Sequence, residues 1–186
     1  MSLAVQNAAN ALTLLRLFCV PPIVAFTLSG RFREAAVLFV LAALTDLADG
    51  YVAKRISGTS ALGAALDPVA DKLLMASLFL ALLIEGHLPI WLAALVIGRD
   101  LLIVAGTLTL RLLIGPFRIA PLPIGKLATF LQLVLGGAIL LELSLLPQLE
   151  PVLQPLMLLT AAVIVASALA YVHAAARIRA LARSER

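Results

Sequence analysis

Four aspartates in two neighbouring apolar stretches are the residues best suited to chemistry in this sequence: Asp46, Asp49, Asp67 and Asp71. A carboxylate at or near membrane depth is energetically expensive, so four of them need a functional explanation. Alone, the carboxylates would repel one another into protonation, whereas bound divalent cations would stabilise them as ionised ligands. Oxygen-only ligation favours a hard ion over zinc. The sequence therefore predicts a site for Mg²⁺ or Mn²⁺, and we expect two ions.

Helical geometry would bring these aspartates together. At 100° per residue, Asp46 and Asp49 lie on one stripe of a helix. Asp67 and Asp71 are four residues apart and share a face of the next helix. A short loop joins the two helices, which must therefore be neighbours. Two glycines beside the aspartates would let a ligand approach the backbone where a side chain would block it: Gly50 and Gly63.

Helix capping is the alternative explanation for an acid at a membrane surface. Asp67 precedes Pro68, and this pair resembles an N-cap followed by proline in the first turn of a helix. Capping could account for Asp67 by itself. It does not explain four acids in register on two apolar helices.

The elements that must position the aspartates are membrane helices. The chain has 63% hydrophobic and 13% charged residues and a mean hydropathy of +1.12, far from the composition of a soluble domain. Six apolar stretches come close to the ~20 residues that cross a bilayer as a helix. They are residues 10–30, 35–54, 67–86, 89–112, 123–146 and 151–173. We expect an all-α, polytopic membrane protein with six transmembrane helices in one domain, residues 1–186.

The basic residues indicate the orientation of these helices. Of the 14 lysines and arginines, Arg31 and Arg33 fall on one side and three others at membrane depth. Nine fall on the opposite side, which predicts that this side, both termini and the aspartate site are cytoplasmic, in an inner membrane. Since the basic residues are not interleaved with aromatics, we expect no nucleic-acid partner. The nine are Lys54, Arg55, Arg111, Arg118, Lys126, Arg177, Arg179, Arg183 and Arg186.

At the aspartates the sequence resembles the CDP-alcohol phosphotransferases, also called CDP-alcohol phosphatidyltransferases. Their signature is D-x2-D-G-x2-A-R, eight residues, and then G-x3-D-x3-D. The one departure is Lys54, which stands where the family usually has arginine and lacks the planar fork of a guanidinium. The opening segment from Asn10 to Arg16 is similar to the phosphatidylglycerol and cardiolipin branch. The matching positions are Asp46, Asp49, Gly50, Ala53, Gly63, Asp67 and Asp71.

The resemblance implies a reaction in which an alcohol attacks the β-phosphorus of CDP-diacylglycerol and expels CMP. It implies that the four aspartates hold the metal ions and that Asp71 also takes the proton of the alcohol. The expected partners are CDP-diacylglycerol, a lipid or phosphorylated alcohol as acceptor, and membrane lipids, with a homodimer as the candidate assembly. By motif position, the CDP pocket would be lined by Gly50, Ala53, Lys54 and Gly63.

The acceptor would meet the basic residues of the fourth and fifth stretches. Arg99 beside Asp100 is either a structural ion pair or, with Arg118 and Lys126, a holder of the acceptor's phosphate. The segments Gly-Arg-Asp-Leu-Leu-Ile and Gly-Lys-Leu-Ala-Thr-Phe-Leu-Gln look more like eukaryotic-type cardiolipin synthases. Ala128 stands where glycerol-phosphate enzymes of the family have a second lysine. We therefore expect phosphatidylglycerol as acceptor, giving cardiolipin, with glycerol 3-phosphate as the alternative.

A cation transporter is the competing function from another class, because intramembrane aspartates also mark ion paths. The second and third stretches run from Ala35 to Leu44 and from Leu73 to Ile84 without a charged residue. An ion bound at the aspartates would therefore have no polar route onward. An enzyme is the favoured interpretation.

Overall fold

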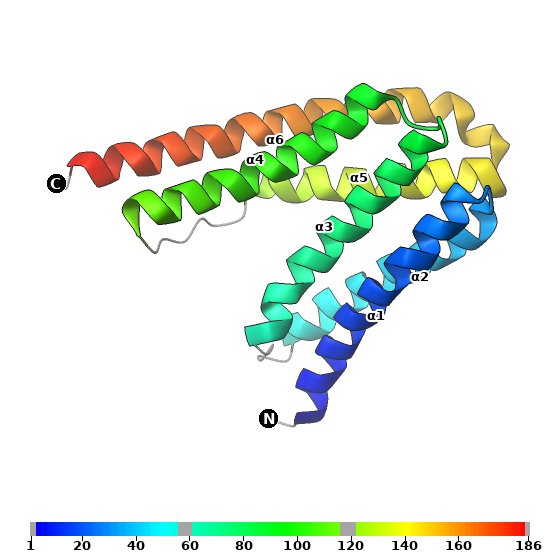
Figure 1. Ribbon diagram of the computed structural model, residues 1–186, viewed down its shortest axis with the longest axis horizontal. Coiled ribbons are helices and arrows are strands. Elements are labelled where there is room, and N and C mark those ends of the chain that lie inside the picture. The colour runs from blue at the N-terminus through cyan, green and yellow to red at the C-terminus, as the bar shows by residue number, and fades with distance from the viewer. Residues whose placement is uncertain (1–2, 56–60, 116–121, 185–186) are drawn as a thin grey trace. The chain divides into compact units, whose positions relative to one another are not determined.

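The computed structural model describes residues 3–55, 61–115 and 122–184, with side chains described over 15–45, 72–113 and 122–180 and at Gly115. In these ranges the chain is entirely helical, which confirms the predicted all-α class (Figure 1). Six α-helices and one short 3₁₀-helix follow one another: α1 (Leu3–Leu28), α2 (Phe32–Arg55), α3 (Ala61–Ile84), α4 (Ile90–Ile114), α5 (Pro123–Ser144), η1 (Pro147–Leu149) and α6 (Glu150–Ser184).

Glycines end three of these helices. Gly30, Gly86 and Gly115 have φ angles of +69°, +80° and +87°, a left-handed conformation that glycine adopts without a steric penalty. After α1, the amide of Arg31 donates to the Phe26 carbonyl at 2.8 Å, closing a Schellman turn. The α1–α2 connection is therefore a tight and fully hydrogen-bonded turn.

Contacts within the chain divide it into two compact units. Unit 1 comprises Met1–Pro89 and Gly136–Pro151, and unit 2 comprises Ile90–Leu135 and Val152–Arg186. In unit 1, α1 packs against both α2 and α3. The described core of this unit consists of fully buried apolar side chains, among them Ile23, Phe39, Leu78, Phe79 and Leu82.

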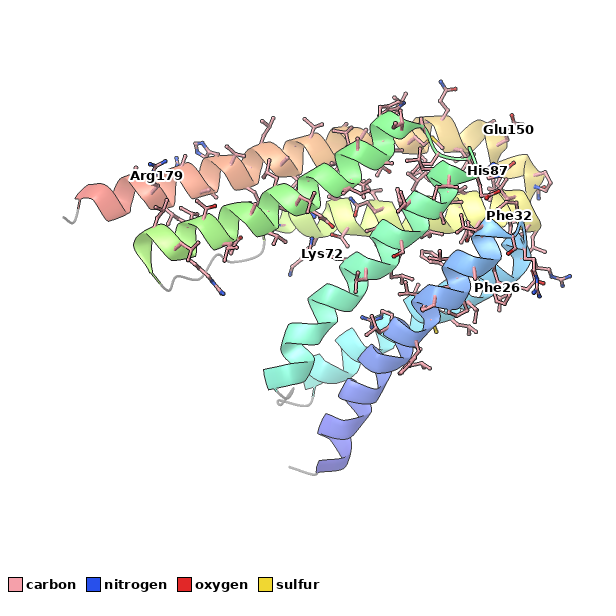
Figure 2. The ribbon with its side chains drawn as sticks, viewed as in Figure 1. Phe26, Phe32, Lys72, His87, Glu150 and Arg179 are labelled. Carbon is pink, nitrogen blue, oxygen red and sulfur yellow. The ribbon has the colours of Figure 1, made fainter. Side chains whose placement is uncertain are left out.

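An aromatic contact lies at the end of unit 1 where α1 meets α2 and α3 finishes (Figure 2). The rings of Phe32 and His87 meet edge to face with centroids 5.1 Å apart. The guanidinium of Arg31 lies 4.5 Å from the centroid of the Phe26 ring and pairs with Glu34 at 2.8 Å. These contacts hold the α1–α2 turn and the turn that follows α3. Both turns lie at the ends of α2 and α3 opposite to the aspartates.

In unit 2, α4 and α6 run in the same direction beside the first half of α5. Their basic residues Arg111, Arg177 and Arg179 follow the packed region at the ends of the two helices. The buried apolar side chains of this unit include Leu92, Val96, Ala128, Leu135 and Ile164.

Three helices are long and apolar enough to cross a membrane among the described residues: Ile90–Leu113, Pro123–Ser144 and Pro147–Ala180. Two shorter apolar helices are Leu15–Leu28 and Lys72–Ile84. Large apolar side chains are exposed along α4 and α6, for example Leu112 at 79% and Leu169 at 65%. Such exposure is expected where helices face lipid rather than water. The chain is a membrane protein, and its crossing the bilayer six times stays a prediction.

Three helix boundaries differ from the expected ones by more than three residues. The first apolar stretch was expected to begin at residue 10, but α1 begins at Leu3. The third apolar stretch was expected to begin at residue 67, but α3 begins at Ala61 and continues through Pro68. Asp67 is therefore not the N-cap of this helix, and the capping explanation of that residue is wrong. At the other end of the chain, the last stretch was expected to end at residue 173, but α6 continues to Ser184, so the basic tail beyond His173 is helical.

Candidate functional site

The backbone of the aspartate region has the helical register that the motif requires. Asp46 and Asp49 lie in the continuous helix α2, and Asp67 and Asp71 lie in α3. Spacings of three and four residues place each pair on one face of its helix. Since α2 and α3 both pack against α1, the two pairs belong to one unit.

The side chains of the aspartates lie outside the described part of the chain, as do the positions expected to line the CDP pocket. Arg118 lies outside the described residues altogether. Among the described side chains, no group of three or more His, Cys, Asp or Glu residues is placed to hold a metal ion. The metal site at the four aspartates therefore stays a prediction.

Arg16 is a buried charge in α1, the helix that contacts both aspartate helices. Its side chain is 1% exposed and is among the largest fully buried side chains described. A guanidinium taken out of water needs acidic or polar partners of good geometry. Arg16 is one of the three basic residues expected at membrane depth. Its burial places a positive charge inside the unit that carries the motif.

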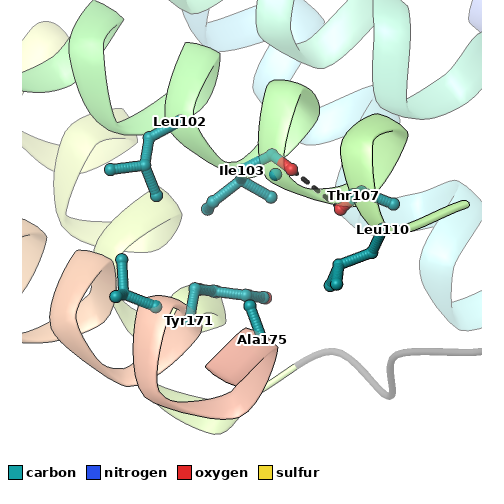
Figure 3. A pocket seen from close by; sticks show the side chains of 8 residues that line it. Leu102, Ile103, Thr107, Leu110, Tyr171 and Ala175 are labelled. Atoms are coloured by element: carbon teal, nitrogen blue, oxygen red, sulfur yellow. Dashed lines mark hydrogen bonds between the residues drawn. The ribbon is translucent and has the colours of Figure 1, made fainter. Parts of the chain in front are cut away.

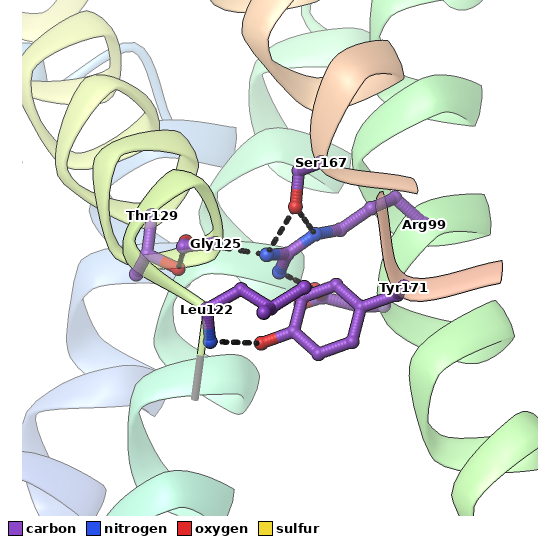
Figure 4. A network of polar contacts seen from close by, with 7 residues as sticks. Arg99, Leu122, Gly125, Thr129, Ser167 and Tyr171 are labelled. Carbon is purple, nitrogen blue, oxygen red and sulfur yellow. Dashed lines mark hydrogen bonds and ion pairs between the residues drawn. The ribbon is translucent and has the colours of Figure 1, made fainter. Parts of the chain in front are cut away.

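The second candidate region is a polar cluster in unit 2 centred on Arg99 (Figure 4). The Arg99 side chain is buried, with 7% of the residue exposed. Its Nε and Nη2 donate to Ser167 Oγ at 3.4 and 3.0 Å, and Nη2 also donates to the Gly125 carbonyl at 3.2 Å. Its Nη1 donates to Asp100 Oδ1 at 2.7 Å. The guanidinium thus joins α4 to α5 and α6.

Tyr171 completes the cluster at the start of α5. Its hydroxyl accepts a hydrogen bond from the Leu122 amide at 3.4 Å, and its ring centroid lies 5.8 Å from Arg99 Cζ. Helix α5 begins at Pro123, a residue well suited to the first helical position because it has no amide hydrogen to satisfy. We call Arg99, Asp100, Gly125, Ser167 and Tyr171 the Arg99 cluster.

Gly125 is packed too closely to carry a side chain. A Cβ built on it would lie 2.9 Å from the Tyr171 hydroxyl and 3.2 Å from Arg99 Nη2. Its carbonyl accepts a second hydrogen bond, from Thr129 Oγ1 at 3.2 Å. The glycine therefore lets the first turn of α5 approach α4 and α6 directly.

The other predicted acceptor residues of α5 have different surroundings. Lys126 is exposed, one residue beyond Gly125. Ala128 is fully buried at 0% exposure. The Cβ of a lysine at position 128 would thus lie among packed side chains.

A hollow of about 160 Å³ lies between α4 and α6 beside Tyr171 (Figure 3). It is lined by residues within 102–110 and 171–175, nearly all apolar. Thr107 is polar, but its hydroxyl donates to the Ile103 carbonyl of its own helix at 2.7 Å. Among the described residues, the hollow is therefore lined by none of the charged donors that a phosphate needs.

Comparisons with known proteins agree with the motif. A probable phosphatidylglycerophosphate synthase of Mycobacterium tuberculosis is 37% identical over 147 residues, which cover 75% of this chain and 68% of that protein. A cardiolipin synthase (CMP-forming) of Rattus norvegicus is 33% identical over 145 residues, covering 69% of this chain and 48% of that protein. A cardiolipin synthase/mitochondrial hydrolase fusion protein of Schizosaccharomyces pombe is 37% identical over 148 residues, which form 25% of its length.

The family comparison covers most of the chain and both units. Residues 6–175 match the model of the CDP-alcohol phosphatidyltransferase family. The match confirms the resemblance on which the predicted enzyme class rests, and it favours an enzyme over the transporter alternative. The chain belongs to the CDP-alcohol phosphatidyltransferase family.

Proposed function

We propose that this protein transfers the phosphatidyl group of CDP-diacylglycerol to phosphatidylglycerol, giving cardiolipin and CMP. The observation that carries the proposal is the family match over residues 6–175, with the four aspartates at motif positions on two continuous helices. In the reaction the acceptor hydroxyl oxygen forms a bond to the β-phosphorus. The bond from that phosphorus to the CMP oxygen breaks, and the hydroxyl proton goes to a carboxylate.

The donor set fits the divalent metals that the family generally uses. Asp46, Asp49, Asp67 and Asp71 offer only oxygen ligands, the kind that Mg²⁺ and Mn²⁺ prefer. The continuous register of α2 and α3 supports their convergence. When bound, the metal would neutralise charge on the pyrophosphate and on the departing CMP.

Asp71 would also act as the general base. It would accept the proton of the acceptor hydroxyl, a role that a carboxylate near the attacking oxygen can fill. Lys54 would meet the pyrophosphate as a point charge, because it lacks the fork that makes bidentate contacts. The CDP pocket would be lined by Gly50, Ala53, Lys54 and Gly63.

The acceptor pocket would be formed at the start of α5. Lys126 is the fourth residue of this helix, close to the positive end of the helix dipole, which favours an anion. Arg99 is held beside the same turn by its hydrogen bonds to the Gly125 carbonyl and to Ser167 Oγ. Three of its nitrogens already donate hydrogen bonds, so it would act mainly through its charge and the remaining Nη1 hydrogen. Arg118 would add a third cation from the α4–α5 connection.

The identity of the acceptor rests on position 128. A glycerol 3-phosphate acceptor is dianionic and benefits from an added lysine, whereas the hydroxyl of phosphatidylglycerol does not need one. Ala128 leaves that place apolar and fully buried. Glycerol 3-phosphate remains the second candidate, because the mycobacterial synthase is matched over a larger share of its length than the rat cardiolipin synthase.

The proposed setting is an inner membrane crossed six times by one domain, with both termini and the site on the cytoplasmic side. The direction of α4 and α6 supports this arrangement, because both helices end in basic residues and basic residues favour the cytoplasmic side. A homodimer is the proposed assembly.

The test is an assay of the purified full-length protein in lipid micelles. It receives CDP-diacylglycerol with phosphatidylglycerol, glycerol 3-phosphate or inositol phosphate in parallel, and the products are resolved by mass spectrometry. We expect metal-dependent CMP release and cardiolipin with phosphatidylglycerol. Phosphatidylglycerophosphate as the main product would reassign the acceptor, and no CMP release with any acceptor would overturn the proposal.

A further inference from the structure

Two polar residues of α6 have no part in the proposed chemistry, and both face the start of α5. Ser167 and Tyr171 are four residues apart and so lie on one face of the helix. Residues on the opposite side, such as Val165 and Leu169, are exposed and apolar. Ser167 and Tyr171 therefore lie on the face of α6 that contacts Arg99 and the start of α5.

Ser167 satisfies the buried guanidinium. Its Oγ accepts hydrogen bonds from two nitrogens of Arg99, at 3.0 and 3.4 Å, and Ser167 itself is 0% exposed. A buried charged donor that loses its acceptor bears the full desolvation penalty. Without the serine hydroxyl, Arg99 would turn toward another acceptor and leave its place beside Gly125.

Tyr171 holds the residue that precedes α5. The Leu122 amide lies at the cap position of the helix, where amides have no partner within the helix itself. It donates to the Tyr171 hydroxyl, while the Leu122 carbonyl accepts from the amides of Gly125 and Lys126 at 3.0 and 3.3 Å. Leu122 thus links the Tyr171 hydroxyl to the turn that carries Lys126.

We infer that Ser167 and Tyr171 are positioning residues of the acceptor pocket. They hold the Arg99 guanidinium and the first turn of α5 in one arrangement, and through them they set where Arg99 and Lys126 meet an anionic acceptor. This inference rests on the proposed function. The ligand class is a phosphate-bearing alcohol, whether a lipid headgroup or a free phosphomonoester.

A purely structural role would lower stability and affect both substrates alike. A positioning role changes acceptor kinetics selectively, because the CDP-diacylglycerol site belongs to the aspartate motif. The separation of acceptor KM from CDP-diacylglycerol KM therefore distinguishes the two roles.

The experiment measures both KM values, kcat and Tm of full-length variants in the same lipid micelles, with phosphatidylglycerol and with glycerol 3-phosphate. Ser167→Ala should raise the acceptor KM about tenfold, since it removes hydrogen bonds to a charged group. Ser167→Thr keeps a hydroxyl and should restore most of the loss. Tyr171→Phe keeps the ring and should raise the acceptor KM about threefold, the smaller effect of one neutral hydrogen bond.

Two matched controls separate position from general packing. Thr160→Val removes a fully buried hydroxyl of the same helix that bonds only its own Leu156 carbonyl at 2.7 Å among the described contacts. The second control is Gly98→Ala, which lies next to Arg99 but has nothing within 4 Å of the added Cβ. Thr160→Val and Gly98→Ala should both keep the acceptor KM of the unmodified protein. Gly125→Ala, in contrast, should raise the acceptor KM by displacing Tyr171 and Arg99.

The outcomes are distinct. An acceptor KM unchanged in Ser167→Ala, with CMP release intact, would overturn the positioning role and leave the proposed reaction standing. An equal rise in both KM values would reduce the two residues to packing. An unmodified protein that releases no CMP with any acceptor would overturn the reaction and the inference with it.

Discussion

The aspartate region of unit 1 and the Arg99 cluster of unit 2 are assembled from the chain in different ways. The acidic residues follow a fixed spacing within two helices joined by a short connection, so their grouping depends on local helical geometry. The cluster unites three helices through residues as distant in sequence as Arg99 and Ser167. A regularly spaced set of acids can therefore be recognised in sequence, whereas a cluster such as that of Arg99 becomes visible only through the tertiary contacts.

The largest effect is expected at the aspartates that we propose as metal ligands. Asp46→Ala, Asp49→Ala or Asp67→Ala should each remove nearly all CMP release while the protein still inserts, because the ligands share their cations. Chelation by EDTA should have the same effect and be reversed by Mg²⁺. Glu85→Gln, an acid just beyond the end of α3, is the matched control and should keep full activity. Substantial turnover in EDTA would contradict the metal site.

The next effect distinguishes two roles of Asp71, that of general base and that of metal ligand. Asp71→Asn keeps the shape of the side chain and removes its ability to accept a proton. Turnover should fall by about 10²-fold or more while binding of CDP-diacylglycerol is largely kept. Equilibrium binding and single-turnover rates measure the two quantities. Loss of binding together with turnover would make Asp71 primarily a ligand.

A smaller and more selective effect is expected on the basic side. Arg99→Ala and Lys126→Ala should raise the acceptor KM with little change for CDP-diacylglycerol. Arg99→Ala should also lower Tm, because it breaks contacts among three helices, whereas Lys126 is exposed and its loss should leave Tm unchanged. Arg99→Lys should not restore the acceptor KM, since one ammonium cannot reproduce the planar fork. Unchanged acceptor kinetics in both alanine variants would reduce Arg99–Asp100 to a structural pair.

The smallest effect concerns an ion pair away from both regions. The hydrogen bond from Arg31 lowers the pKa of the Glu34 carboxyl. A lowered folded-state pKa adds stability above the ordinary carboxyl pKa and loses it as the pH falls through the folded value. Glu34→Gln should therefore produce a slight decrease in Tm at neutral pH that vanishes in acid. Because the pair is exposed, CMP release should be unaffected; a loss of activity would link this turn to the site.

The sequence predicted the six helices because hydropathy reports burial in lipid directly. It misplaced the start of α3, since Asp67-Pro68 looks like a helix beginning while the preceding alanines and Gly63 continue the helix back to Ala61. The helix α6 extends past the last apolar stretch because the alanines and arginines of the tail favour helix.

The roles of Ser167 and Tyr171 could not be predicted from the sequence. A single serine or tyrosine in an apolar stretch carries no signal until the helix facing it is known. Arg99 gave a signal because a charge at membrane depth demands a partner. Asp100 was the partner visible in sequence, and the contacts to Gly125 and Ser167 required the fold.

The helix α6 extends far beyond its contact with Arg99. Thirty-five residues at 1.5 Å each extend about 52 Å, well beyond a hydrocarbon core of about 30 Å. From Ser167 to the last turn the helix continues for roughly 25 Å. Any tilt of α6 about its contact with Arg99 at Ser167 would therefore displace the basic tail more than the contact itself. A spin label placed in the tail would report such a tilt.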